Sequence, residues 1–125
     1  MCALAIHYAD DRRAAFSELF RVLRGGGSLV LSTQHPTVDW LRKGGSYFDV
    51  LVEVDTFRLD GRGEWEVRFW REPLSSLTDA ATSVGFFIER IVEPLPSATI
   101  RERWPDRYEK LAHRPDFLLM RLRKP

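Results

Sequence analysis

Three histidines, one cysteine and their neighbours are the side chains best suited to acid–base, nucleophilic or metal chemistry. His7 and Tyr8 follow the apolar run MCALAI, and His35 follows the run SLVLST and precedes Pro36. A histidine can titrate near neutral pH, so His35 is the candidate catalytic base or substrate contact. A histidine before proline is also often a turn residue whose ring bonds to the backbone, and this alternative stays open.

The spacing of these residues does not fit a metal site. The histidines lie far apart in the sequence, and Cys2 has no second cysteine to join it. A zinc site needs three or four converging ligands, so we expect no metal. Cys2 can form no internal disulfide, which is typical of a reducing cytoplasm, and its apolar neighbours favour burial over reactivity.

Length and charge restrict the class of protein. The 125 residues are enough for one domain, and 19 basic against 18 acidic side chains leave a net charge of +1. This balance offers no field for nucleic acid or an anionic membrane. The first apolar run is short and soon meets Asp10 and Asp11, unlike a signal or an anchor. The sequence predicts a single cytoplasmic domain over 1–125, with no nucleic-acid or membrane partner.

The first 36 residues have the pattern of a strand, a helix and a second strand. MCALAI and SLVLST are continuous apolar runs, typical of strands covered on both faces. Apolar residues between them recur at spacings of three and four, which predicts a helix from Asp11 to Arg24. Gly25 is predicted to occupy the left-handed position after this helix. Short connections between such elements predict a parallel pair of strands.

The ends of these two strands are expected to meet at one edge of the sheet. Ligands of open parallel sheets lie beyond the carboxyl ends of the strands. His7 and Tyr8 follow the first strand, and Thr33 to Pro36 follow the second. Both segments therefore point to one site.

The remaining sequence changes to an alternating pattern and then to mixed elements. Alternating apolar residues and a turn at Asp60 to Gly63 predict a long β-hairpin within 47–72. Ser75 or Ser76 is predicted to cap a helix that Gly85 ends. We further expect a strand at FFIERIVE, an irregular segment with one helical turn over 95–114, and a last strand over 117–123.

Several segments carry a family resemblance. IHYADD, ELFRVLRGGGSLVLSTQHP, WREPLSSLTDAATSVGF, IVEP and RPDFLLMRLRK resemble successive parts of a class I, Rossmann-like, small-molecule S-adenosylmethionine (SAM)-dependent methyltransferase. The resemblance covers nearly the whole chain, and its most specific parts are RVL with its glycines, the His-Pro pair and PDFLL. It implies an α/β fold: a partial Rossmann-like methyltransferase sheet, the C-terminal half, with mixed parallel and antiparallel strands and an inserted long hairpin.

One feature of that family is missing from the sequence. The family binds SAM on a glycine-rich turn after its first strand, whereas Gly25, Gly26 and Gly27 follow a helix and enter a strand. The resemblance therefore implies a truncated domain that begins in the fourth strand. SAM would be the cofactor of the complete enzyme, and this chain alone is expected neither to bind SAM normally nor to be active.

The resemblance also implies site residues. Ala3, Leu4 and His7 match the segment that approaches the methionine part of the cofactor. The hairpin and the segment before it resemble the insertion over the substrate opening, where aromatic side chains could form an apolar pocket. The candidates for this pocket are Tyr8, Trp40, Tyr47, Trp70 and Arg71. In the alternative, the aromatic residues pack the hairpin onto the sheet and Arg71 forms an ion pair.

A sheet that begins in its middle would leave a strand edge unpaired. We therefore expect a homodimer that forms through the first strand, the hairpin or both. Three functions stay open: part of a methyltransferase acting on an unknown small molecule, a self-associating or regulatory binding module, or an unrelated small-ligand-binding α/β domain.

Overall fold

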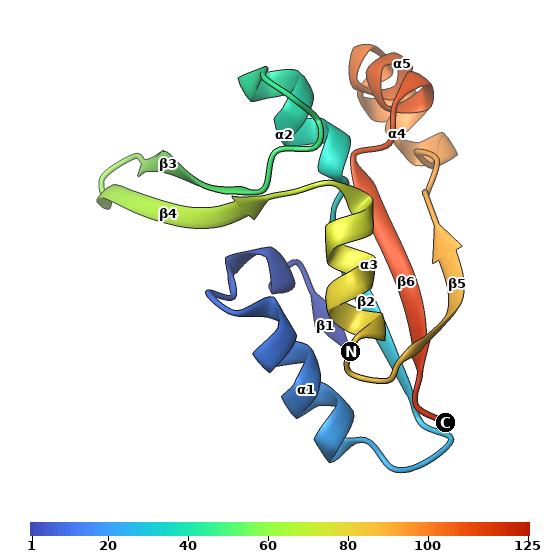
Figure 1. Cartoon of the computed structure of the whole chain (residues 1–125). Helices are drawn as coiled ribbons and strands as arrows, with labels where there is room; N and C mark the ends of the chain where they lie inside the picture. The colour runs from blue at the N-terminus through green and yellow to red at the C-terminus, as the bar shows by residue number, and fades with distance from the viewer.

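The computed structural model describes residues 1–125 and contains one four-stranded sheet, one two-stranded hairpin and several short helices (Figure 1). The elements follow one another as β1 Cys2–Ala3, the 3-10 helix η1 Ile6–Tyr8, α1 Arg12–Val22, β2 Ser28–Gln34, α2 Pro36–Lys43, β3 Leu51–Leu59, β4 Gly63–Arg71, α3 Leu74–Thr82, β5 Phe87–Val92, α4 Ala98–Arg103, α5 Pro105–His113 and β6 Phe117–Arg123. None of these helices is both long enough and apolar enough to cross a membrane.

The main sheet has the strand order β1-β2-β6-β5 and mixes parallel with antiparallel pairs. β1 pairs with β2 in parallel, Cys2 opposite Leu31 and Ala3 opposite Ser32, while β6 is antiparallel to both β2 and β5. This confirms the predicted mixed α/β sheet and its parallel pair. β1 is shorter than the predicted MCALAI strand because Leu4 turns the backbone at φ 48 and Ile6 begins η1.

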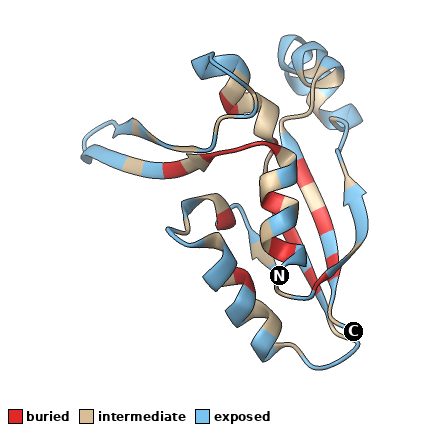
Figure 2. Ribbon diagram, in the orientation of Figure 1, coloured by how far each residue is buried: buried red, intermediate tan, exposed pale blue.

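One face of the sheet carries the hydrophobic core. The helices α1 and α3 both lie on this face (Figure 1), and the buried residues gather between them and the strands (Figure 2). The rings of Phe16 and Phe20 meet Phe86 edge to face, at centroid distances of 6.4 and 5.0 Å. The buried cluster consists of Ile6, Phe16, Leu29, Leu31, Leu77, Ala81, Phe86, Leu118, Met120 and Leu122.

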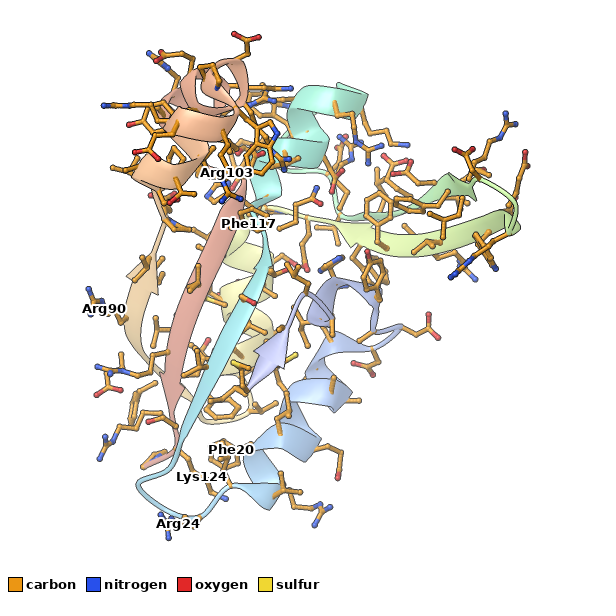
Figure 3. The ribbon with its side chains drawn as sticks, turned by 180° about the vertical axis from the view of Figure 1, so that it is seen from behind. Phe20, Arg24, Arg90, Arg103, Phe117 and Lys124 are labelled. Carbon is orange, nitrogen blue, oxygen red and sulfur yellow. The ribbon has the colours of Figure 1, made fainter.

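The opposite face of the sheet is open within these residues. Figure 3 views the molecule from this side, and no helix lies over the strands there. In β2, Leu29 and Leu31 are buried whereas Val30 is 42% exposed, and Phe117 of β6 is 45% exposed. The prediction that SLVLST is covered on both faces is therefore wrong for this part of the protein.

The end of α1 differs from the prediction. Gly25 is not in the left-handed region; Gly26 is, at φ 72. The helix ends at Val22, and Lys124 Nζ donates hydrogen bonds to the carbonyl oxygens of Phe20 and Leu23 at 2.7 and 2.8 Å. Figure 3 shows Lys124 beside Phe20 at this end of the helix. The last carbonyls of α1 are thus satisfied by a side chain from the far end of the sequence rather than by a glycine turn.

Three helical segments depart from expectation. α3 begins after Pro73, not after a serine cap; Ser75 and Ser76 lie inside its first turn, and the hydroxyl of Ser76 donates a hydrogen bond to Glu72. The 95–114 segment contains the two helices α4 and α5, joined by a hydrogen bond from Arg101 to the Tyr108 hydroxyl, where one turn was expected. α2 was not predicted, although a proline at its first position is a recognised start signal.

The hairpin agrees with the predicted range. β3 and β4 pair from Leu51 opposite Arg71 to Leu59 opposite Gly63. The arm projects away from the main sheet (Figure 1), and the buried positions lie at its base, toward the end of β4 (Figure 2). Its outer strand positions Val52, Val54 and Phe57 are 37%, 48% and 50% exposed.

Gly85 supplies a test of this packing. Its φ is 106, and a Cβ atom there would lie 3.0 Å from Cζ of Phe20. We expect Gly85→Ala to lower the free energy of unfolding by about 2 kcal/mol, through backbone strain and the clash with a core ring. Urea unfolding followed by circular dichroism measures this loss.

Gly61→Ala is the matched control. Gly61 also has a positive φ, 75, but nothing lies within 4 Å of the added carbon. This variant should lose only about 1 kcal/mol from strain. Equal losses at the two positions would show that the contact with Phe20 adds nothing.

Candidate functional site

Two small cavities lie side by side where β2 ends and η1 follows β1. Each holds about 30 Å³, and they share His7, Gln34 and Asp39. This is the edge at which the sequence predicts a site. The first cavity is lined by His7, Thr33, Gln34, His35, Pro36, Asp39, Trp70, Arg71, Glu72 and Leu77. The second is lined by His7, Tyr8, Gln34, Asp39, Phe57 and Phe69.

His7 is the histidine common to both cavities. Its Nδ1 lies 2.9 Å from the hydroxyl oxygen of Thr33, which fixes the ring, and Nε2 makes no hydrogen bond within the chain. Burial lowers the pKa of His7 from its usual value, and the nearby carboxylate of Asp39 opposes this only in part. The ring is therefore mainly neutral at pH 7 and can accept a proton or a hydrogen bond through one nitrogen.

Asp39 joins the cavities to a chain of charged groups on α2 and the hairpin. Its Oδ2 accepts a hydrogen bond from Gln34 Nε2 at 2.8 Å, and its Oδ1 lies 2.6 Å from Arg42 Nη2. Nη2 of Arg42 also lies 2.6 Å from Oδ2 of Asp55 in β3, and Nζ of Lys43 lies 2.6 Å from Oδ1 of Asp55. The hydrogen bond from Arg42 is the main reason that the pKa of Asp55 is lowered. This network fixes the hairpin base to α2.

Glu72 is a buried carboxylate at the other side of the first cavity. Its Oε1 lies 2.7 Å from Nε of Arg12, and the two side chains are 6% and 11% exposed. Burial raises the pKa of Glu72, while the hydroxyl of Ser76 and the charge of Arg12 favour the ionised form. The guanidinium of Arg12 also lies 4.3 Å from the ring centroid of Trp70. Arg12 therefore neutralises Glu72 and supports the wall of the cavity.

Arg71 is buried and engaged by its surroundings. Its Nε lies 3.0 Å from Glu53, and its Nη1 donates to the carbonyl oxygen of Gly44. The side chain lines the first cavity but has a carboxylate partner of its own. This geometry agrees with the alternative in which Arg71 forms an ion pair; Arg71 is buried, and its partner Glu53 is half-buried.

His35 has both ring nitrogens occupied. Nδ1 accepts a hydrogen bond from the backbone N–H of Thr37 at 3.2 Å, which caps α2, and Nε2 lies 3.0 Å from Glu93 Oε1. Because Nδ1 is an acceptor, the proton of the neutral ring is on Nε2 and faces Glu93. The catalytic role of His35 stays a prediction, and its geometry suits a positioning role better.

The other predicted site residues divide into two groups. Tyr8 and Trp70 line the cavities, whereas Trp40 and Tyr47 pack on each other at 5.7 Å beside α2. Ala3 and Leu4 line neither cavity. Their predicted roles in substrate and cofactor binding stay predictions.

Several lining residues were missed by the sequence analysis. Asp39, Phe57 and Phe69 come from α2, β3 and β4, Glu72 follows β4, and no local spacing joins them. The one available signal was the alternation of the hairpin, which places Phe57 and Phe69 on the same face as Asp55 and Val67. Only the packing of the hairpin base against η1 brings that face to the site.

The half-buried, neutral His7 predicts a pH dependence of stability. The folded protein binds a proton at His7 less readily than the unfolded chain, so stability should decrease as the pH falls below about 6.5. The decrease ends once the folded ring is protonated too. His7→Gln should flatten this part of the curve in denaturant melts between pH 7 and pH 5, whereas His113→Gln, at an exposed position on α5, should leave it unchanged.

The site does not have the dimensions of a complete cofactor pocket. Sites for small molecules usually have volumes of about 300 Å³ or more, far above the 30 Å³ of each cavity here. Neither of these two cavities thus encloses a molecule as large as SAM. No group of three or more His, Cys, Asp or Glu side chains in the structure could hold a metal ion.

Comparisons with known proteins give the fold a precedent. No protein-family model and no curated protein matches the sequence. Among solved structures, the chain is similar to a protein designated a SAM-dependent methyltransferase from Listeria monocytogenes, with TM-score 0.74 and 22% identity over 98% of this chain and 59% of that one. A SAM-dependent methyltransferase from Mesorhizobium loti gives TM-score 0.67 and 24% identity over 98% and 59%. The [4+2]-cyclase SpnF gives TM-score 0.57 and 18% identity over 99% and 49%.

These likenesses define the fold class. The chain has a mixed α/β architecture that matches the C-terminal half of SAM-dependent methyltransferase folds. It spans 59% of the length of the first two structures. The expectation of a methyltransferase-like fold is confirmed, and the alternative of an unrelated α/β domain is not supported.

Proposed function

We propose that this chain forms the acceptor side of a SAM-dependent methyltransferase that acts on a small molecule. The observation that carries the proposal is the match of 98% of the chain to the L. monocytogenes structure, together with the polar cavities at the shared sheet edge. The donor half of the site would come from residues outside these 125. The chain alone is then expected to bind SAM weakly and to be inactive.

The residues of the site suit this role. Methyl transfer from a sulfonium needs alignment of the acceptor and exclusion of water, and it needs a base only if the acceptor must lose a proton. His7 is fixed by Thr33 and neutral, while Trp70 and Tyr8 line the cavities and would cover a bound molecule. SAM supplies the methyl group when bound; the residues described here would hold and shield the acceptor.

Calorimetry tests the proposal that this chain holds the acceptor side of the site and that the donor side lies elsewhere. S-adenosylhomocysteine titrated into the 125-residue chain should give no heat of binding at micromolar concentrations, since the cavities are too small to enclose it. Micromolar binding would contradict the proposal that the donor half lies elsewhere. The control is the same titration into a complete SAM-dependent methyltransferase.

We also propose that the chain forms a homodimer and that it is cytoplasmic. β1 contributes only two residues to the sheet, so the hairpin, with Val52 and Val54 exposed, is the better surface for a second copy. A monomer by light scattering at micromolar concentration would contradict the dimer.

A single cysteine suits a cytoplasmic protein.

The similarity to SpnF favours one alternative function. That structure is a [4+2]-cyclase, so this fold also carries a reaction other than methyl transfer. A chain that binds a small molecule at the cavities, while its complete protein transfers no methyl group, would favour this second class of function.

A further inference from the structure

The size of the cavities restricts what part of a ligand they can hold. Each has about 30 Å³, which is the room that one water molecule or one hydroxyl group takes up. A small-molecule ligand would therefore place one compact polar group in the site. The rest of the ligand would lie outside, against the rim.

The rim of the second cavity is aromatic. Tyr8 and Phe57 both line it and are 46% and 50% exposed, with Phe69 buried beside them. Tyr8 is itself held in place by His7, with ring centroids 4.0 Å apart. Half-exposed aromatic rings of this kind favour offset or edge-to-face contact with another flat ring. The rim thus suits an aromatic ligand body.

The charges around the cavities are already compensated. Asp39 lies 2.6 Å from Arg42, and Glu72 lies 2.7 Å from Arg12. Arg71 is likewise paired, because its Nε lies 3.0 Å from Oε1 of Glu53. A charged ligand group would lose its hydration here and find no free counter-ion, which is costly. The site therefore favours a neutral group.

Two hydrogen-bonding groups at the cavities lack a partner within the chain. Nδ1 of His7 pairs with the Thr33 hydroxyl, which leaves Nε2 to accept a hydrogen bond in one tautomer of the ring and to donate one in the other. Gln34 uses its amide N–H on Asp39, and its amide oxygen makes no hydrogen bond within the chain. A hydroxyl group suits both, because it can donate to the Gln34 amide oxygen and can either donate to or accept from Nε2 of His7.

We propose that the site takes a flat, neutral aromatic molecule with a phenol-type hydroxyl group, the hydroxyl in the cavity beside His7 and the ring against Tyr8 and Phe57. This inference rests on the proposed function, because it names the chemical class of the acceptor. It does not depend on where the methyl donor binds.

A matched series of four probes tests the inference on the 125-residue chain. The probes are 4-ethylphenol, 4-ethylanisole, 4-ethylbenzoate and 4-ethylbenzylammonium, which share one ring and differ in the polar group. Binding is followed by ¹H–¹⁵N NMR, which detects millimolar affinities. We expect 4-ethylphenol to shift the signals of Thr33, Gln34 and Phe57 and to bind about fivefold more tightly than the other three, the worth of about one hydrogen bond. Equal or tighter binding of the benzoate or the ammonium probe, or shifts confined to another surface, would overturn the proposal.

Three variants assign the contacts. Phe57→Ala should weaken the binding of 4-ethylphenol about fivefold, because it removes the aromatic contact. Trp65→Ala, opposite Phe57 on the hairpin and 43% exposed but outside the cavity, should not. His7→Phe should remove the preference for 4-ethylphenol over 4-ethylanisole while leaving the anisole affinity unchanged. Should His7→Phe fail to fold, the exposed Phe57 and Trp65 positions still decide the matter, and equal affinities of those two variants would overturn the proposal.

The result can be separated from the test of the proposed function. The probe series contains no methyl donor, whereas the S-adenosylhomocysteine titration contains no acceptor. Selective binding of 4-ethylphenol together with micromolar S-adenosylhomocysteine binding would support this inference and contradict the division of the site. If no probe binds selectively and S-adenosylhomocysteine does not bind, the inference of a phenol-type ligand is contradicted, and the proposal that the donor half lies elsewhere is supported.

Discussion

Phe86→Ala is expected to lower the free energy of unfolding by about 4 kcal/mol, the usual cost of removing a fully buried aromatic side chain. Phe86 is 2% exposed and meets the rings of Phe16 and Phe20 edge to face, at 6.4 and 5.0 Å. Its ring joins α1 to the start of β5, so its loss leaves a cavity in the centre of the core. Urea unfolding followed by far-UV circular dichroism measures the change.

The next residue is the matched control for this prediction. Phe87 has the same side chain, but it points to the open face of the sheet and is 65% exposed. Phe87→Ala should therefore change the free energy of unfolding by less than about 0.5 kcal/mol. A comparable loss at the two positions would mean that the open face is covered in solution, and a small loss at Phe86 would contradict the described core.

Arg12→Met is expected to cost about 3 kcal/mol of stability at pH 7, since it leaves the buried carboxylate of Glu72 without its counter-ion. The two side chains are 11% and 6% exposed and 2.7 Å apart. Burial already raises the pKa of Glu72, so the folded protein binds a proton there more readily than the unfolded chain. The penalty should therefore be largest at high pH and decrease as the pH falls toward the ordinary glutamate pKa of about 4.5, because the buried Glu72 takes up its proton above that value.

Two further variants test this account. Glu72→Gln added to Arg12→Met removes the unpaired charge and should restore a large part of the lost stability. Arg21→Met breaks the pair with Glu18 on the same helix, whose side chains are 69% and 67% exposed, and should have no measurable effect. A loss for Arg12→Met that does not change with pH would show that packing against Trp70, and not the charge of Glu72, is the cause.

The shared fold does not by itself define the reaction. Of the three similar structures described, two are methyltransferases and one is a [4+2]-cyclase. What distinguishes such proteins is the set of side chains at the sheet edge. The neutral His7, the compensated carboxylates and the aromatic rim are therefore the features on which the proposed acceptor class depends.

The candidate site was predictable in place but not in composition. Runs of apolar residues locate the two strands, and the rule for parallel sheets then locates the edge that holds His7 and Tyr8. The same reasoning ranked His35 above His7 as a base. Both ring nitrogens of His35 are occupied by Thr37 and Glu93, and only the folded chain brings Glu93 to that ring.

What the sequence determined by itself is the set of elements whose patterns are local. The second strand, the last strand, the hairpin and the strand-helix-strand unit follow from periodicity and turn residues, because neighbouring side chains alone decide which face of a strand or helix is apolar. The tertiary structure decided the rest. Lys124 caps α1, Arg12 neutralises Glu72, and Phe57 lines a cavity together with His7, each through the packing of residues distant in the sequence. Such contacts depend on how the elements pack, and no local spacing encodes them.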